Sequence, residues 1–283
     1  MGGGDSNDAA PWAAAIYRWQ HGRLELLDYC DPEESTLEVA DSWLVSQGSV
    51  LALELHRSRF LASIAARGFD PAPAEEVWDA AVAAIPRSGD WFPRVELRSH
   101  DGAPQYLFRL RSAPLRNRSI VLAAFHGEDP RTAPTIKGPD LAAMLRLRTD
   151  AQQRGADDAV LLSPHGFVIE GAHTALLWWR GEILCAPALH LERTDSVTAK
   201  SILGLAAALG TEVYYESVTA SELGGVELWA VNALHGIRIV TSWIDGPSTA
   251  EQPGRLRKWR RLLDTLRKPL PPAALIKTEA TSP

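Results

Sequence analysis

The sequence predicts an α+β fold. Its 283 residues include 46% hydrophobic and 23% charged residues, which is the composition of a globular protein with a full core. Most strand-like segments follow one another across short turns, and short turns join antiparallel neighbours. The mixed order of strands and helices therefore favours α+β layers over a regular βαβ winding, and no internal repeat is visible.

The first 127 residues read as strands with two helices among them. Helices are expected over 56–67, closed by Gly68, and over 74–85. Turn signals at Gly22, Gly48 and Gly102 separate several of the strand patterns. The expected strands lie at 13–19, 23–27, 43–45, 50–53, 94–98, 106–110 and 120–124.

A polar stretch bounded by prolines, 127–134, is the best linker candidate. We therefore expect an N-terminal α/β domain over 11–127, a linker over 128–135, a C-terminal domain over 136–270 and a loose tail over 271–283. Beyond the linker, helices are expected over 140–154, 197–209 and 255–268. The expected strands lie at 160–169 (a hairpin), 176–183 (a strand pair), 213–215, 228–231 and 237–240.

Charge and cysteine usage exclude several classes of partner. The formal net charge is −6 and the sequence pI is about 5.8, so nucleic acid and membranes are not expected partners. The first residues lack the apolar core of a signal peptide, and no apolar run is long enough for a transmembrane helix. Cys30 and Cys185 have no metal-binding spacing, so we expect a cytoplasmic protein without a metal site.

Four places in the sequence combine a polar residue with a structural signal. Lys137 precedes a helix, Glu170 ends an apolar strand, and Ser196–Thr198 opens another helix, whose free amides suit an anion. Arg59 lies in the helical segment His56–Phe60. Read alone, these are a surface lysine, a turn carboxylate, an ordinary N-cap and a surface arginine.

Taken in order, the segments around these residues resemble the fold-type IV pyridoxal-phosphate (PLP) enzymes, which include class IV aminotransferases and aminodeoxychorismate lyases. The resemblance implies a D-amino acid aminotransferase-like α+β fold, with a small α/β N-terminal domain and a C-terminal pseudo-barrel. PLP would lie between the domains of a homodimer. The segments that carry it are 135–140, 155–162, 166–172, 179–187, 196–198 and 231–237.

The same resemblance assigns roles to individual residues. It makes Lys137 the catalytic lysine that forms the Schiff base with PLP and Glu170 the partner of the pyridinium nitrogen. Arg59, Val197 and Thr198 would hold the phosphate, with Asn232 and Ala233 also at the cofactor. Candidate substrate residues are Ser42, Arg131, His173 and His235, with Arg238 as an alternative to Arg131 for a substrate carboxylate.

Departures from the family pattern bear on the activity. Branched-chain aminotransferases have a tyrosine where this chain has Ala142 and a threonine where it has Ala233, whereas Asn232-Ala233-Leu234 is similar to the lyases. A glycine-rich segment common to both groups is replaced by 38–44. The leading expectation is an aminodeoxychorismate lyase-like elimination of pyruvate that gives 4-aminobenzoate. The alternatives are an aminotransferase of the branched-chain or D-amino acid type, acting on small amino and keto acids, and a non-catalytic PLP- or ligand-binding descendant.

Overall fold

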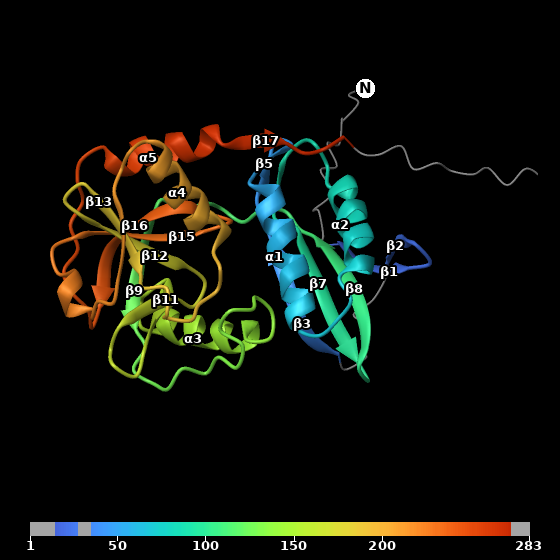
Figure 1. Cartoon of the computed structure of the whole chain (residues 1–283), viewed down its shortest axis with the longest axis horizontal. Coiled ribbons are helices and arrows are strands. Elements are labelled where there is room, and N and C mark those ends of the chain that lie inside the picture. Colours follow the sequence, from blue (N-terminus) through green and yellow to red (C-terminus); the bar gives the residue numbers. More distant parts are fainter. Residues whose placement is uncertain (1–14, 28–34, 273–283) are drawn as a thin grey trace, which may run out of the picture.

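The computed structural model describes residues 15–27 and 35–272. Cys30, the first residues of the expected N-terminal domain and the expected tail from residue 273 lie outside the described residues. The molecule has two halves that lie side by side, each built on its own large β-sheet (Figure 1).

The N-terminal half is a five-stranded antiparallel sheet, ordered β2-β1-β8-β7-β3, with two helices packed on it (Figure 1). The helices are α1 (Leu53–Ala66) and α2 (Ala72–Ala84). Their buried side chains, among them Phe60 and Trp78, join Phe108 of the sheet in one core. The strands are β1 (Ala15–Gln20), β2 (Arg23–Leu26), β3 (Thr36–Ser42), β7 (Arg94–His100) and β8 (Ala103–Leu110).

The C-terminal half is a curled eight-stranded sheet, ordered β11-β10-β9-β16-β15-β12-β13-β14. Its strands are β9 (Ser119–Ala124), β10 (Asp158–Leu162), β11 (Val168–Gly171), β12 (Ala175–Arg180), β13 (Ile183–Pro187), β14 (Val213–Glu216), β15 (Glu227–Asn232) and β16 (Gly236–Ile244). Its helices are α3 (Leu141–Gln153), α4 (Val197–Ala208), the short 3₁₀ helix η1 (Ser221–Leu223) and α5 (Arg255–Thr265).

Strand β12 shows why this sheet is apolar on both faces. Leu176 and Trp178 point into one buried cluster, whereas Leu177 and Trp179 point into another, because successive strand residues face opposite sides. The second cluster also contains Ile202 of α4 and Trp259 of α5, so these helices cover that face. The strand therefore reads as a continuous apolar run without a polar face.

The expected α+β class is confirmed, and the structure adds two things that the sequence pattern did not predict. Strand β3 was not expected; it pairs antiparallel with β7 at one edge of the N-terminal sheet. Strand β9 pairs in parallel with both β10 and β16, which no pattern of short turns could indicate. The expected hairpin around Gly48 is shorter than predicted, with strands β4 (Val45–Ser46) and β5 (Ser49–Leu51).

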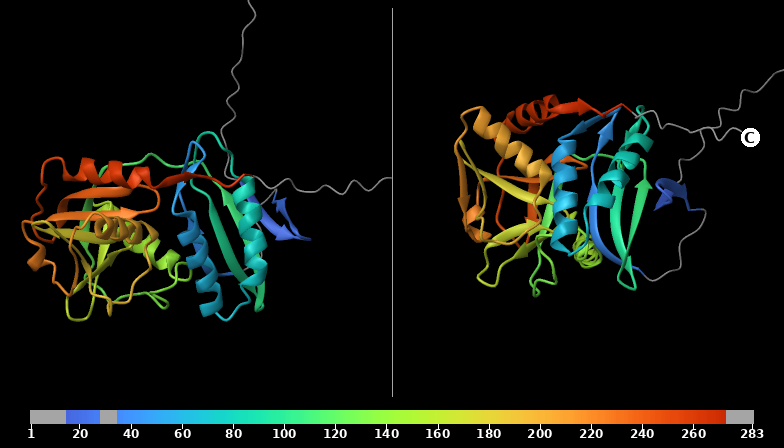
Figure 2. Two further views of the ribbon diagram at one scale, coloured as in Figure 1. Left: turned by 45° about the horizontal axis from the view of Figure 1, so that its top comes forward. Right: turned by 45° about the vertical axis from the view of Figure 1, so that its right-hand side comes forward.

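The predicted helix 255–268 was wrong at its end. Helix α5 stops at Thr265, and Arg267–Pro269 forms strand β17, which pairs antiparallel with β5. A third sheet results, ordered β17-β5-β4-β6, with β6 at Asp90–Trp91. Figure 2 shows this last segment, in red, reaching from the C-terminal half to the N-terminal half. Hydrogen bonds to the β5 edge outweigh the helical pattern there.

Helix α5 docks on the C-terminal sheet through two buried side chains. Trp259 and Leu263 are buried against the sheet, whereas Arg257, Lys258 and Arg261 are exposed. Within the described residues, no helix is long and apolar enough to cross a membrane.

Leu270 anchors β17 to the N-terminal core, where it is 6% exposed and its N–H donates to the carbonyl of Gly48 at 2.8 Å. We predict that Leu270→Ala lowers the free energy of unfolding by about 2–5 kcal/mol, because it leaves a cavity in a packed core. Denaturant unfolding measures the change. Leu266→Ala is the matched control, since Leu266 is 37% exposed, and an equal loss for both variants would contradict the prediction.

Candidate active site

A cavity of about 750 Å³ is lined by residues from both halves. Sequence positions far apart come together here, and all the predicted site residues are among its lining. These are Ser42, Arg59, Arg131, Lys137, Glu170, His173, Val197, Thr198, Asn232, Ala233, His235 and Arg238. Among the residues that the structure describes, no group of three or more histidine, cysteine or acidic side chains is arranged to hold a metal ion.

Lys137 is positioned by the docking of its own backbone onto β3. The N–H of Ala40 donates to the carbonyl of Lys137 at 2.7 Å. The next residue, Gly138, has φ 158°, and a Cβ there would lie 2.7 Å from Cα of Val39. Only glycine allows so close an approach of two backbones, so the loop before α3 holds Lys137 against the N-terminal half.

The environment of Lys137 favours a neutral amine. Its pKa is lowered to about 8, chiefly by desolvation and in addition by the positive charges of Arg59 and Arg94, while Asp41 acts in the opposite direction. An uncharged amine is the nucleophilic form of a lysine. The amine of Lys137 therefore lines the cavity and is partly in its nucleophilic, uncharged form near neutral pH, unlike the amine of a solvated surface lysine.

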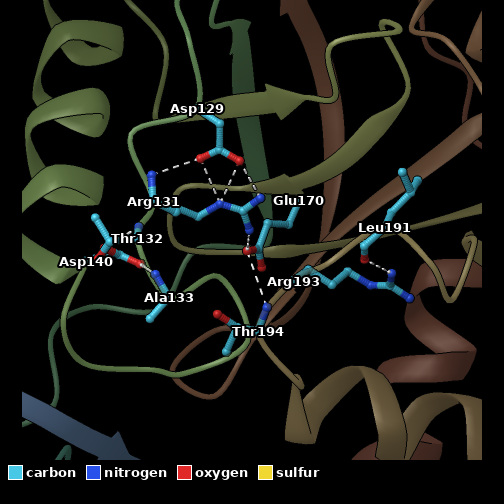
Figure 3. Close-up of polar contacts among 9 residues, drawn as sticks. All are labelled: Asp129, Arg131, Thr132, Ala133, Asp140, Glu170, Leu191, Arg193 and Thr194. Atoms are coloured by element: carbon cyan, nitrogen blue, oxygen red, sulfur yellow. Dashed lines mark hydrogen bonds and ion pairs between the residues drawn. The ribbon is translucent and has the colours of Figure 1, made fainter. Parts of the chain in front are cut away.

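Glu170, on β11, is held by hydrogen bonds from a guanidinium group and from a backbone N–H (Figure 3). Nη1 of Arg131 donates to Oε1 of Glu170 at 2.6 Å, and the N–H of Thr194 donates to the same oxygen at 3.4 Å. Asp129 accepts hydrogen bonds from Nε and Nη2 of Arg131 on the other side. Burial raises the pKa of Glu170 to about 7, although Arg131 opposes this shift. The second oxygen of Glu170 remains available to a ligand in the cavity.

Arg131 was a candidate for a substrate carboxylate. Its side chain is 4% exposed and its guanidinium pairs with Asp129 and Glu170. This arrangement favours a positioning role, in which Arg131 orients the carboxylate of Glu170, over contact with a substrate.

Asp140 closes the loop that carries Lys137 (Figure 3). Its carboxylate accepts hydrogen bonds from the N–H groups of Thr132 and Ala133 and from the Thr132 hydroxyl, at 2.8–2.9 Å. Both ends of the loop 132–140 are therefore tied together on either side of Lys137, which reduces the conformations available to the lysine backbone.

The start of α4 offers free amides to an anion. The Ser196 side chain accepts a hydrogen bond from the N–H of Ala199 at 3.2 Å. Val197 and Thr198 are the first residues of the helix, so their N–H groups have no acceptor within it. The preceding loop is fixed by Arg193, which donates to the carbonyls of residues 187, 188 and 191. A rigid, positively polarised helix end thus lines the cavity.

Arg59 lies beside this helix start, within a buried cluster that the sequence analysis had not singled out. Nε and Nη2 of Arg59 donate to the carboxylate of Asp41, each at 2.8 Å, and Nη1 donates to the carbonyl of Asp195 at 2.8 Å. Nδ1 of His56 lies 2.7 Å from Oδ1 of Asp41, the oxygen that also accepts from Nη2 of Arg59. Asp41 is 1% exposed, and Arg59 and His56 hold its pKa below the ordinary value against desolvation.

Asp41 and His56 were missed for different reasons. Asp41 lies in the segment 38–44, which departs from the family pattern. His56 stood inside the arginine motif 56–60, but its partner could not be identified without β3. Together they orient the Arg59 guanidinium and leave its remaining N–H groups free for an anion.

The residues near Asn232 form a tight turn. Oδ1 of Asn232 accepts the N–H of His235 at 2.8 Å, and its Nδ2 donates to the carbonyl of His173 at 3.2 Å. His235 in turn accepts the N–H of Asn117 at 3.1 Å through Nδ1. The side chain of Asn232 thus shapes the cavity wall by binding the backbone of His173 and His235. Ser42 lies on the opposite half, where its hydroxyl accepts from Nε of Arg94 at 3.3 Å.

Solved structures share this architecture at low sequence identity. A fold IV-transaminase from Curtobacterium pusillum is 18% identical and has a TM-score of 0.74, covering 89% of this chain and 98% of that chain. A PLP-bound hypothetical aminotransferase from Mycobacterium tuberculosis is 17% identical, with a TM-score of 0.73, covering 90% and 98%. A branched-chain aminotransferase from Thermoproteus uzoniensis is 18% identical, with a TM-score of 0.75, covering 91% and 100%.

These likenesses confirm the expected fold-type IV architecture. No curated protein matches the sequence. The family model described as amino-transferase class IV matches residues 38–243, which include most of both halves and every predicted site residue. This chain therefore belongs to the class IV aminotransferase family.

Proposed function

We propose that this protein is a PLP-dependent aminotransferase that moves an amino group between an amino acid and a 2-oxo acid. The observation that carries the proposal is the presence, in one cavity, of a lysine with a lowered pKa and a buried carboxylate with a raised one. The matching solved structures include a transaminase and a branched-chain aminotransferase by name. PLP chemistry needs an amine, an acid at the ring nitrogen and a phosphate site.

The residues present fit PLP. The amine of Lys137 would anchor the aldehyde, the free oxygen of Glu170 would face the pyridine nitrogen, and Arg59 with the amides of Val197 and Thr198 would hold the phosphate. When bound, PLP supplies the electron sink for the reaction. Lys137 would move the proton at the substrate carbon, and Glu170, oriented by Arg131, would hold the proton at the ring nitrogen.

A lyase remains the second candidate, because Asn232-Ala233-Leu234 is similar to the aminodeoxychorismate lyases and Ala142 replaces the tyrosine of branched-chain enzymes. We favour amino transfer over elimination because the family model and the similar solved structures are described as aminotransferases. The same cofactor residues serve both reactions, so the two activities can be distinguished only by testing their different substrates.

An activity panel makes this separation. We predict transfer from an amino acid to added 2-oxo acids, measured by chromatography of the new amino acid, without release of pyruvate from aminodeoxychorismate. Pyruvate release without an acceptor would instead support the lyase. Absence of both reactions in a protein that binds PLP would support a non-catalytic descendant.

We also propose a homodimer in which a second copy closes the cavity. Leu115 is 92% exposed and Leu145 is 54% exposed, and both line the cavity. Large exposed apolar side chains around a pocket are typical of a surface that a partner covers. Light scattering of the purified protein gives the mass and tests this.

Lys137→Ala removes the amine and therefore should abolish both the visible absorption band of bound PLP and all turnover. Spectra and activity are measured on the same preparation after adding PLP. Lys258→Ala is the matched control, because Lys258 is an exposed lysine of α5. A normal spectrum in Lys137→Ala would exclude this lysine as the anchor.

The pH dependence of PLP uptake tests the environment of Lys137. Only the neutral amine attacks the aldehyde, and its pKa is lowered to about 8. We predict that the rate of uptake into the PLP-free protein, followed by absorbance, rises with pH and levels off above about pH 8. A rate that still rises steeply above pH 10 would show an ordinary solvated lysine.

A further inference from the structure

Two arginines of the cavity lack the partners that the other cavity arginines have. Arg59, Arg94 and Arg131 each lie within 4 Å of a carboxylate, namely those of Asp41, Glu96, and Asp129 with Glu170. Arg148 and Arg238 also line the cavity, but no ion pair joins either of them to a described residue. These two arginines lie on one wall of the cavity, which is formed by α3 and the first residues of β16.

Arg238 is the more unusual of the two. It is 4% exposed, and its Nε is buried without a hydrogen-bond partner among the described residues. It stands between Ile237 and Ile239 on β16, and its own face of the sheet continues with Val240 in an apolar cluster. Burying a guanidinium without partners costs free energy that an apolar side chain would not. Its pKa falls to about 10 through burial, so it is still a cation at neutral pH.

Other donors surround Arg238 on this wall. Arg148 lowers the pKa of Arg238, and both arginines lower the pKa values of His173 and His235, so the four side chains lie within electrostatic range of one another. Nδ1 of His173 is a second buried atom without a hydrogen-bond partner in the described part of the chain. Burial is the largest cause of the shift in both histidines, to about 3 and about 4 respectively.

The neighbouring carboxylates of Asp157 and Asp158 accept hydrogen bonds from backbone N–H groups and from one hydroxyl. Asp158 accepts hydrogen bonds from the Thr174 hydroxyl and the N–H of His173 through Oδ2, and Asp157 accepts the N–H of Val121. Burial raises the pKa of Asp158 to about 6. Arg148 meets Asp157 only through the backbone carbonyl, which accepts from its Nε at 3.1 Å. The two guanidinium groups therefore keep donors for a ligand.

We propose that Arg238 and Arg148 form an anion subsite that binds a carboxylate of the substrate. A planar guanidinium matches a carboxylate with two parallel hydrogen bonds, and both arginines line a cavity of about 750 Å³ that a small acid could enter. The inference rests on the proposed function, since it places the substrate in the cavity of Lys137. The carboxylate is either the one on the amino-bearing carbon or a second one at the far end of a dicarboxylic substrate.

The first test measures binding without turnover. Thermal unfolding of the PLP-loaded protein is followed with and without glutarate, a dicarboxylate, or butyrate, a monocarboxylate. We expect glutarate to raise the melting temperature, and Arg238→Met to remove the increase while leaving the ligand-free protein as stable as before or more stable. An Arg238-dependent effect of butyrate as well would identify the carboxylate on the amino-bearing carbon. An effect of glutarate alone would identify the remote one.

Arg146→Gln is the matched control, because Arg146 is an exposed arginine two residues from Arg148 on α3. The control should keep the full increase. If Arg238→Met fails to fold, Arg148→Gln and Arg238→Lys take its place: the first should reduce the increase, and the second should keep part of it. An unchanged increase in the Arg238 and Arg148 variants would overturn the proposal.

The second test uses kinetics. Arg238→Met should lower kcat/KM for the acid that binds this subsite by about 10- to 100-fold, chiefly through KM, as expected for loss of a charged hydrogen-bonding partner. An amine without a carboxylate should be unaffected. Equal losses for that amine would overturn the subsite. Arg238-dependent glutarate binding in a protein without aminotransferase activity would leave the subsite standing and refute only the proposed function.

Discussion

The site depends on one backbone contact between the two halves of the molecule. The loop that carries Lys137 belongs to the C-terminal half by sequence, yet it docks on β3 through the hydrogen bond from the N–H of Ala40 to the carbonyl of Lys137. Gly138 permits the contact, because any Cβ would collide with the backbone of Val39. The position of the lysine is therefore set by strand β3, about a hundred residues earlier in the chain.

Around this contact, the charged groups of the cavity are arranged by burial. Desolvation lowers the pKa of Lys137 and raises that of Glu170, so both move toward neutral pH from opposite directions. Each neutral form is the one that a low-dielectric cavity favours. Arg131 and Arg59 are held by their own carboxylates, which fixes their direction without removing every donor. A charged ligand would meet groups whose orientation is already determined.

The two halves are also connected at a second place. Strand β17 extends the small sheet at β5, and Leu270 enters the N-terminal core. The chain thus crosses between the halves before β9 and again after α5, on either side of the whole curled sheet (Figure 1). These crossings restrict the relative movement of the walls that Arg59 and Glu170 provide, since each wall belongs to a different half.

The sequence by itself determined the α+β class, the starts of most helices and strands, and a set of candidate residues that line one cavity. It could do so because periodicity and turn residues act locally, and because the ordered motifs from Lys137 to Asn232 resemble one family. Strand β3, the parallel neighbours of β9 and the return of 267–269 to β5 were decided only by the tertiary structure, since pairing between distant segments leaves no local pattern. The same holds for the partners of charged residues. Nothing in the sequence distinguishes Arg59, Arg131 and Arg238 as single arginines, and only the fold gives carboxylates to the first two and leaves the third without an ion pair to any described residue.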